Sequence, residues 1–259
     1  MNEFKKKSFI LELFNAIRKI DIDKKSPVVI YSSFIPIFKA INFVDKKIID
    51  QLLEFLIDHY GDRGILMPSF TNGYNNNYVC NLDNEKSNSG VLSDTFRKNN
   101  KVIRTLSAYF SYLYLGPNNN EILSLSPEYV WGLNSVLEWI QNNNASLLMI
   151  GLNPTQNSFP HRLEWLARES ITYRENILKE GTVIRNNKNY FLSEKLFARK
   201  NDFNVENNFS KLFNFLNKDK IKFIKINGVL LSCYKSSEII KSIYPLVKED
   251  PFFLINQRI

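Results

Sequence analysis

Two short apolar runs separated by one amphipathic segment constrain the fold of this chain more than any other feature. Residues 27–31 and 64–68 have the length and composition of buried strands. Between them, Asp45 can begin a helix whose apolar side chains recur at helical spacing until Gly61 ends it. A strand, a helix and a second strand in this order form a βαβ unit with parallel strands. We therefore predict an α/β fold.

Later segments extend this sheet. A helix is expected over residues 132–143, followed by a fully buried strand over residues 145–151. Residues 223–231 predict a hairpin, because Asn227-Gly228 is the pair favoured in a type I′ turn. We expect a three-layer arrangement in which helices flank a central, partly parallel mixed sheet, with antiparallel additions in the C-terminal half.

The connections carry further expectations. Residues 71–89 are rich in Asn and turn residues and show no periodicity, so we predict a long loop. Residues 182–192 predict a second hairpin, and Ser236 can cap a final helix. No linker-like break interrupts these patterns, and a single domain over residues 1–259 is expected.

Composition and charge exclude several classes of protein. The chain has no apolar stretch of the roughly 20 residues that span a bilayer and no signal peptide, so we expect a cytoplasmic protein without membrane contact. Cys80 and Cys233 have no metal-site spacing, and no metal is expected. The net charge of +8 suits phosphate-bearing molecules, but the basic residues are dispersed and show no nucleic-acid signature. We expect no nucleic-acid partner.

His161 is the leading catalytic candidate. It is one of two histidines, it follows the strand at 145–151, and Glu164 lies three residues further on, where a helical turn brings it close. An imidazole moves protons near neutral pH, and a carboxylate can fix its tautomer. The alternative is a histidine that caps a helix or packs in the core. His59, near a helix end, is assigned no catalytic role.

Polar residues also follow three other apolar runs. These segments are Tyr31-Ser32-Ser33-Phe34, residues 67–71 and the run from Arg104 to Ser107. Open α/β sheets place ligands at strand ends, so hydroxyl, backbone and guanidinium groups there could hold a carbonyl or a phosphate. Ordinary turns and a structural Arg are the competing interpretations.

Taken together, these segments resemble the antibiotic N-acetyltransferase family, that of the aminoglycoside 3-N-acetyltransferases. The segment that begins at Tyr31 corresponds to the family's His-Ser-Ser-Leu. The run from Gly61 to Thr71 corresponds to its Gly-x-x-Gly-Thr-Leu-x-Met-Pro-Thr-Phe-Thr. The family's Arg-Ser-x-His-Pro, Gly-x-x-Ser and Thr-x-x-His-x-x-Glu patterns follow in the same order at residues 104–108, 132–135 and 158–164.

The resemblance implies an acyl-coenzyme A dependent N-acyltransferase domain, with acetyl-CoA or another acyl-CoA as co-substrate. His161 would accept a proton from the attacking amine, and Glu164 would orient the imidazole. The thioester end of the co-substrate and its developing oxyanion would be held by donors at matching positions. The implied cofactor-binding residues are Ser32, Ser33, Phe34, Thr71, Arg104, Thr105 and Ser111.

Two departures from the family pattern bear on the substrate. Tyr31 replaces the family's first His, and Ser107-Ala108 replaces its His-Pro pair. We therefore expect Tyr31 and Ser107 to contact a substrate that has changed. Trp131, Trp139 and Trp165 could also line a sugar site, although packing in the core is the preferred interpretation for each. Trp165, beside Glu164, is the best functional candidate of the three.

Three functions remain open at this stage. The leading hypothesis is acyl transfer to the amine of an amino sugar, in nucleotide-linked form for surface polysaccharide synthesis. The second is an aminoglycoside 3-N-acetyltransferase of antibiotic resistance, and the third is a catalytically inactive binding protein of the same fold. The partner is expected to be a small-molecule amine, and the protein a monomer or a homodimer.

Overall fold

A mixed sheet forms the centre of the computed structural model, which describes residues 3–21, 23–126 and 128–257. Its strands are β1 (Val28–Ser32), β2 (Ile65–Pro68), β4 (Ile103–Arg104), β5 (Tyr112–Leu115), β6 (Ser146–Ile150), β10 (Lys222–Ile226) and β11 (Val229–Lys235). They are ordered β10-β11-β6-β1-β2-β5-β4. The central strands β6, β1 and β2 are parallel, and the remaining pairings are antiparallel. The predicted partly parallel mixed sheet is confirmed, and antiparallel strands also occupy the edge formed by the first half of the chain.

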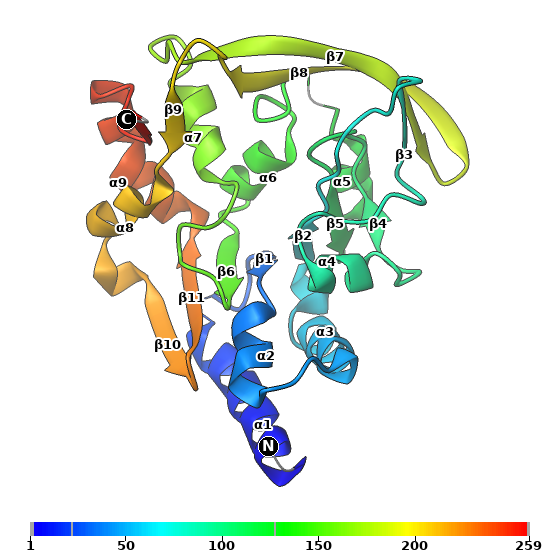
Figure 1. Ribbon diagram of the computed structural model, residues 1–259, viewed down its shortest axis with the longest axis vertical. Coiled ribbons are helices and arrows are strands. Elements are labelled where there is room, and N and C mark those ends of the chain that lie inside the picture. The colour runs from blue at the N-terminus through cyan, green and yellow to red at the C-terminus, as the bar shows by residue number, and fades with distance from the viewer. Residues whose placement is uncertain (1–2, 22, 127, 258–259) are drawn as a thin grey trace.

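Helices cover both faces of this sheet (Figure 1). Alternate residues of β1 point to opposite faces, with Val28 in one apolar core and Val29 in the other. The core around Val28 includes residues of α1 (Glu3–Ile20), α2 (Ile35–Ile41), α3 (Lys46–Tyr60) and α4 (Val91–Phe96). The core around Val29 includes residues of α5 (Asn119–Ser124), α6 (Val136–Asn142), α7 (Pro160–Leu166), α8 (Leu212–Phe215) and α9 (Ser236–Glu249). The expected three-layer arrangement is therefore present.

A long antiparallel ribbon stands apart from the central sheet and runs along one end of the molecule (Figure 1). It consists of β7 (Arg174–Arg185) and β8 (Lys188–Arg199), and β3 (Val79–Asn81) pairs with β7 in parallel. The hairpin predicted over residues 182–192 lies within this ribbon, but its strands are longer than predicted. Most of the added residues are polar and at least partly exposed, so they form no apolar run. A further small sheet joins β9 (Val205–Asn207) to β12 (Ile255–Gln257).

The segment predicted as a long loop, residues 71–89, is not wholly irregular, because it contains β3. This strand has three residues and pairs with residues about a hundred positions further along the chain. Neither its length nor its partner can be seen in a local pattern. The Asp83 carboxylate also accepts backbone hydrogen bonds from Asn186 and Asn187, which ties this segment to the turn of the ribbon.

Two predicted helix starts have different outcomes. Asp45 begins α3 as expected, since its carboxylate accepts a hydrogen bond from the Lys47 backbone nitrogen at 2.9 Å. Ser236 does not cap α9, because its hydroxyl donates to the Ile140 carbonyl at 3.0 Å. The Asn144 side chain instead accepts from the Ser237 backbone nitrogen. The start of α9 is thus fixed from the turn before β6, a contact that local sequence does not reveal.

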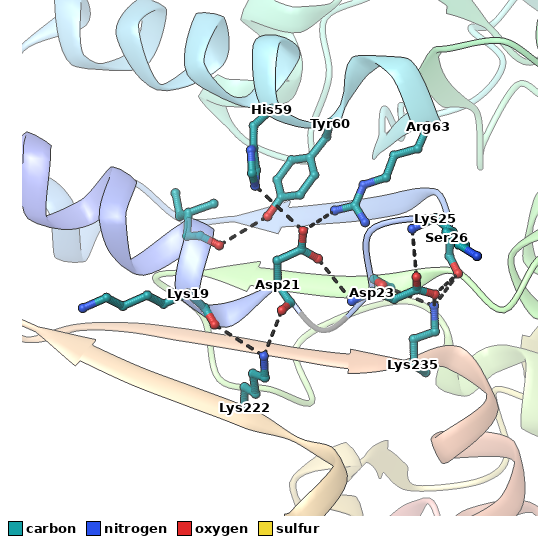
Figure 2. A network of polar contacts seen from close by, with 12 residues as sticks. Lys19, Asp21, Asp23, Lys25, Ser26, His59, Tyr60, Arg63, Lys222 and Lys235 are labelled. Atoms are coloured by element: carbon teal, nitrogen blue, oxygen red, sulfur yellow. Dashed lines mark hydrogen bonds and ion pairs between the residues drawn. The ribbon is translucent and has the colours of Figure 1, made fainter.

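Charged side chains fix the connection between α1 and β1 (Figure 2). The Asp21 carboxylate accepts from Arg63, which follows α3, at 2.7 Å. Lys222, at the start of β10, donates to the Asp21 carbonyl at 2.9 Å. Lys235, at the end of β11, donates to Asp23 at 2.5 Å. These contacts join α3 and the antiparallel edge of the sheet to the beginning of β1.

Within the described residues, no helix is long and apolar enough to cross a membrane.

Candidate active site

A cleft with a volume of about 960 Å³ opens at the carboxyl ends of the parallel strands. Ser32 ends β1, Pro68 ends β2 and Leu152 follows β6, and all three line it. The other lining residues are Tyr31, Phe70, Asn88, Ser89, Gly90, Asn153, Thr155, Gln156, Asn157, Ser158, His161, Asn207, Asn208, Phe209 and Ser210. Open α/β sheets bind ligands at this edge, and the volume is that of a small-molecule site.

His161 and Glu164 form a hydrogen-bonded pair beside this cleft. Both lie on α7, three residues apart, and His161 Nδ1 is 2.6 Å from Glu164 Oε2. The Glu164 side chain has no exposed surface, and its other oxygen accepts from the Tyr173 hydroxyl at 3.0 Å and from Arg174 Nε at 2.8 Å. Because the carboxylate is the partner of Nδ1, it fixes the tautomer that leaves Nε2 as the basic nitrogen. Since His161 lines the cleft, this nitrogen is available for proton transfer.

Burial and charge set the protonation of this pair. Burial lowers the pKa of His161 below its usual range, although the hydrogen bond to Glu164 acts in the opposite direction. Burial alone would raise the pKa of Glu164, but the hydrogen bond from His161 and the charge of Arg174 outweigh it and hold that pKa below the usual range. At neutral pH the pair therefore consists of a neutral imidazole and an ionised carboxylate. A neutral imidazole can accept a proton.

Aromatic rings hold the imidazole in place. The Trp131 ring stacks on His161 with centroids 4.2 Å apart and an interplanar angle of 6°, and Phe209 meets the imidazole edge-on at 5.2 Å. Sequence reasoning preferred Trp165, but that indole packs against the Arg168 guanidinium, 4.2 Å from the ring. Trp131 lies 30 positions before His161, so no local pattern links the two.

Tyr31 enters the cleft from the end of β1. Its hydroxyl lies 3.0 Å from Ser158 Oγ, and the Tyr112 hydroxyl lies 2.7 Å from the same atom. Ser158 also anchors α7, because its carbonyl accepts from the His161 backbone nitrogen at 3.1 Å. Sequence reasoning assigned no role to Ser158 or Tyr112. Tyr112 comes from the antiparallel strand β5, whose position in the sheet was not predicted.

The residues of the first predicted group of co-substrate donors do not come together in the cleft. Ser32 lines the cleft with Tyr31. The Ser33 backbone nitrogen donates to the Ile150 carbonyl at 2.9 Å, which extends the pairing of β1 with β6. Phe34 is buried in the apolar core around Val28, and its ring lies 5.4 Å from that of Phe38. Ser33 and Phe34 are therefore not among the cleft-lining residues.

Arg104 is committed to contacts with the backbone. Its guanidinium donates to the carbonyls of Leu82 at 2.8 Å, Glu85 at 3.0 Å and Ser69 at 2.7 Å, and to the Ser111 hydroxyl at 3.0 Å. The Ser111 hydroxyl in turn donates to the Ser69 carbonyl at 2.7 Å. Burial lowers the pKa of Arg104 to about 10, so the side chain remains cationic at neutral pH. Arg104 and Ser111 thus tie residues 82–85 to the end of β2.

Three further predicted residues bind the backbone away from the cleft. The Thr71 hydroxyl donates to the Ala108 carbonyl. The Thr105 hydroxyl accepts from the Tyr112 nitrogen at 2.8 Å, and the Ser107 hydroxyl accepts from the Phe110 nitrogen at 3.0 Å. Of the predicted site residues, the structure brings Tyr31, Ser32 and His161 to the cleft, with Glu164 directly behind His161.

The comparison with protein families identifies the family of this chain. The family model described as aminoglycoside 3-N-acetyltransferase matches residues 38–243. The chain belongs to the aminoglycoside 3-N-acetyltransferase family. Membership makes it a coenzyme A dependent N-acetyltransferase and confirms the resemblance inferred from its motifs. A search of curated proteins finds no match.

Solved structures of this family share the fold at low sequence identity. The apoenzyme of AAC(3)-IVa is 18% identical with a TM-score of 0.69, and the match covers 95% of this chain and 90% of that one. AAC-VIa bound to sisomicin is 13% identical with a TM-score of 0.75, covering 93% and 97%. AAC-IIIb with CoASH is 12% identical with a TM-score of 0.73, covering 93% and 96%. The family's architecture is thus retained over nearly the whole length of each of these chains.

Proposed function

We propose that this member of the aminoglycoside 3-N-acetyltransferase family acts as a single domain and transfers an acetyl group from acetyl-CoA to the amine of an amino sugar. The proposed acceptor is nucleotide-linked and serves surface polysaccharide assembly. The observation that carries the proposed mechanism is the His161–Glu164 pair at the edge of the cleft. We also propose a cytoplasmic location, supported by Cys80 and Cys233, which are both buried and form no disulfide with each other.

His161 acts as the general base in this proposal. The amine nitrogen attacks the thioester carbonyl carbon, and Nε2 of His161 accepts a proton from that nitrogen as the N–C bond forms. The C–S bond then breaks, and the imidazolium returns the proton to the departing thiolate sulfur. Glu164 stabilises the imidazolium during the transfer, because its carboxylate is already hydrogen-bonded to Nδ1.

The charge that develops on the thioester oxygen needs hydrogen-bond donors. We assign this role to the Ser32 hydroxyl, since Ser32 lines the cleft at the end of β1. Tyr31 is assigned to the acceptor, because it enters the same cleft and its hydroxyl is held by Ser158. Arg104 is assigned a structural role, in view of its contacts with three carbonyls.

Two observations bear on the identity of the acceptor. The net charge of +8 suits a phosphate-bearing acceptor better than a polycation, which supports the nucleotide-linked amino sugar. The sisomicin bound to AAC-VIa favours the second candidate, an aminoglycoside acceptor. A third candidate, an inactive binding protein, is disfavoured by the intact His161–Glu164 pair.

Acetyl transfer from acetyl-CoA to a panel of amines tests the proposal. The panel contains nucleotide-linked amino sugars, free amino sugars and aminoglycosides. We expect turnover with an amino sugar and a fall in kcat of about 10²-fold or more for His161→Ala, the size of a general-base contribution. His59→Ala is the matched control, because His59 is the other histidine and lies 3.8 Å from Asp21, outside the cleft.

Three results would count against the proposal. Unchanged turnover by His161→Ala would eliminate His161 as the base. Turnover of aminoglycosides alone would favour the second candidate. Binding of CoA without transfer to any amine on the panel would favour the inactive binding protein.

A further inference from the structure

The residues described as lining the cleft carry no formal charge unless His161 is protonated. Among the described residues that line it there is no Asp, Glu, Lys or Arg. Amide and hydroxyl side chains supply most of its polar groups. Those from segments outside the central sheet include Asn88, Ser89, Asn153, Gln156, Asn207 and Asn208. From this lining we propose that the acceptor carries the reacting amine as its only cationic group and is otherwise recognised through neutral hydroxyls. This inference rests on the proposed acetyl transfer and names the substrate class for it.

Glu164 does not supply the missing negative charge. It is fully buried, and its two oxygens are engaged by His161, Tyr173 and Arg174. A second ammonium group on the acceptor could reach this carboxylate only by displacing one of those partners. The Glu164 carboxylate is therefore not available to bind an ammonium group of the acceptor.

An acceptor with several amines would be bound poorly by such a lining. Amines of this kind are largely protonated at neutral pH, and each ammonium that enters the cleft loses water without gaining an anionic partner. A sugar hydroxyl can both donate and accept, so it matches an amide side chain in either orientation. The same lining has no cation for a phosphate, so a phosphate of the acceptor has to lie beyond it.

Two amide side chains of the lining have hydrogen-bond donors that the described chain does not use. The Gln156 oxygen accepts from the Asn153 backbone nitrogen at 2.8 Å, and the Asn207 oxygen accepts from Arg174 at 3.3 Å. In both residues the oxygen is held by the protein, and the amide nitrogen makes no hydrogen bond with the described chain. Each nitrogen can therefore donate to a hydroxyl of the acceptor. These donors would repel an ammonium, which has none of the lone pairs that they need.

The test compares acceptors that differ in the number of amines. Acetylation rates are measured with glucosamine and UDP-glucosamine, which have one amine each, and with sisomicin, which has several. We expect kcat/KM to be at least about tenfold higher for the better of the single-amine sugars, on the scale of a lost charge pair in a partly desolvated site. Sisomicin turned over as well as or better than both sugars would overturn the inference and leave acetyl transfer itself intact.

A charge substitution makes the test specific to the cleft. Gln156→Glu keeps the oxygen that accepts from Asn153 and replaces the amide nitrogen with a negative oxygen. We expect kcat/KM for sisomicin to rise about three- to tenfold in this variant. Gln51→Glu adds the same charge on the exposed surface of α3 and should leave the rate unchanged. Equal effects of the two substitutions would contradict a role for the lining.

A calorimetric measurement separates the failure of the two proposals. If no amine is acetylated, the proposed function fails, but binding of UDP-glucosamine, glucosamine and sisomicin can still be compared directly. Tighter binding of a single-amine sugar would support the inference. Tighter binding of sisomicin would overturn it.

Discussion

His161 Nδ1 lies 2.6 Å from Glu164 Oε2, and the side chain of Glu164 is completely buried. Tyr173 and Arg174 bind the other oxygen of this carboxylate, so its position does not depend on His161 alone. The imidazole is confined in turn by the stacked Trp131 ring. The pair therefore holds a neutral base in one orientation before any substrate binds, as general-base catalysis requires.

The first prediction concerns the pH dependence of the native enzyme. His161 must be neutral to accept a proton, and burial lowers its pKa below the ordinary value of about 6.5. Activity should therefore be lost on acidification with a midpoint below about pH 6.5. Values of kcat/KM measured from about pH 5 to about pH 8 with one acceptor check this. A midpoint above about pH 7 would show that Glu164 outweighs burial.

Replacing Glu164 should move that midpoint further down. Glu164→Gln removes the negative charge that raises the His161 pKa, so the acidic midpoint shifts to lower pH. The rate at neutral pH should also fall about 10²-fold or more, because the imidazolium loses its partner. Steady-state kinetics at several pH values measure both effects, and circular dichroism confirms folding. A slower enzyme with an unchanged midpoint would indicate that Glu164 acts only through packing.

Replacing Arg174 should have the opposite effect on pH dependence. Its positive charge lowers the His161 pKa, so Arg174→Gln should shift the acidic midpoint upward. The substitution also leaves the buried Glu164 carboxylate without its cation, which should lower the free energy of unfolding by about 3 kcal/mol. Urea titration and the pH profile measure the two effects. Arg174→Lys keeps the charge and serves as the control, with an expected midpoint close to that of the native enzyme.

The contrast between Glu164 and Trp131 shows what the sequence can reveal about the site. Glu164 was predicted as the partner of His161 because both lie within one turn of a helix, where spacing alone determines proximity. Trp131 and Tyr112 reach the same site from other elements. Their positions depend on how α6, α7 and β5 pack, and no local pattern specifies that packing.

Arg104 is a second residue whose contacts local sequence does not reveal. From the sequence, this Arg at a strand end could bind a phosphate or serve a structural role, and its sequence neighbours gave no indication of the three carbonyls around it. Those carbonyls come from residues 69–85, whose path could not be predicted. The parallel centre of the sheet was predictable because the βαβ unit from β1 to β2 is local and its handedness is fixed. The pairing of β3 with β7 is long-range and was not predicted.

The partly buried ion pair between Asp23 and Lys235 predicts part of the acid sensitivity of the fold. Hydrogen bonds from Lys235 and Ser26 hold the pKa of Asp23 well below its usual range. Its stabilising contribution is therefore fully present above the ordinary pKa of Asp, about 3.9, and is lost as the pH falls below it. Asp23→Asn should cost about 1 kcal/mol at neutral pH and reduce the loss of stability on acidification. Urea titrations at about pH 7 and about pH 2.5 measure this cost, which should be smaller at the lower pH. An equal cost at both values would contradict the ion pair.

The last prediction separates a structural Arg104 from one that binds a phosphate. Arg104→Met leaves the buried carbonyls of Ser69, Leu82 and Glu85 without their donor, which should lower the free energy of unfolding by about 2 to 4 kcal/mol. Residues 71–89 should become easier to cleave with a protease, and kcat/KM should fall for both substrates, because Asn88 and Ser89 line the cleft. The free energy of unfolding of Arg104→Lys should lie between those of the native protein and Arg104→Met, because one ammonium cannot reach all the carbonyls that a guanidinium does. A selective rise in KM for acetyl-CoA, with native stability and native protease resistance, would instead place a phosphate on Arg104.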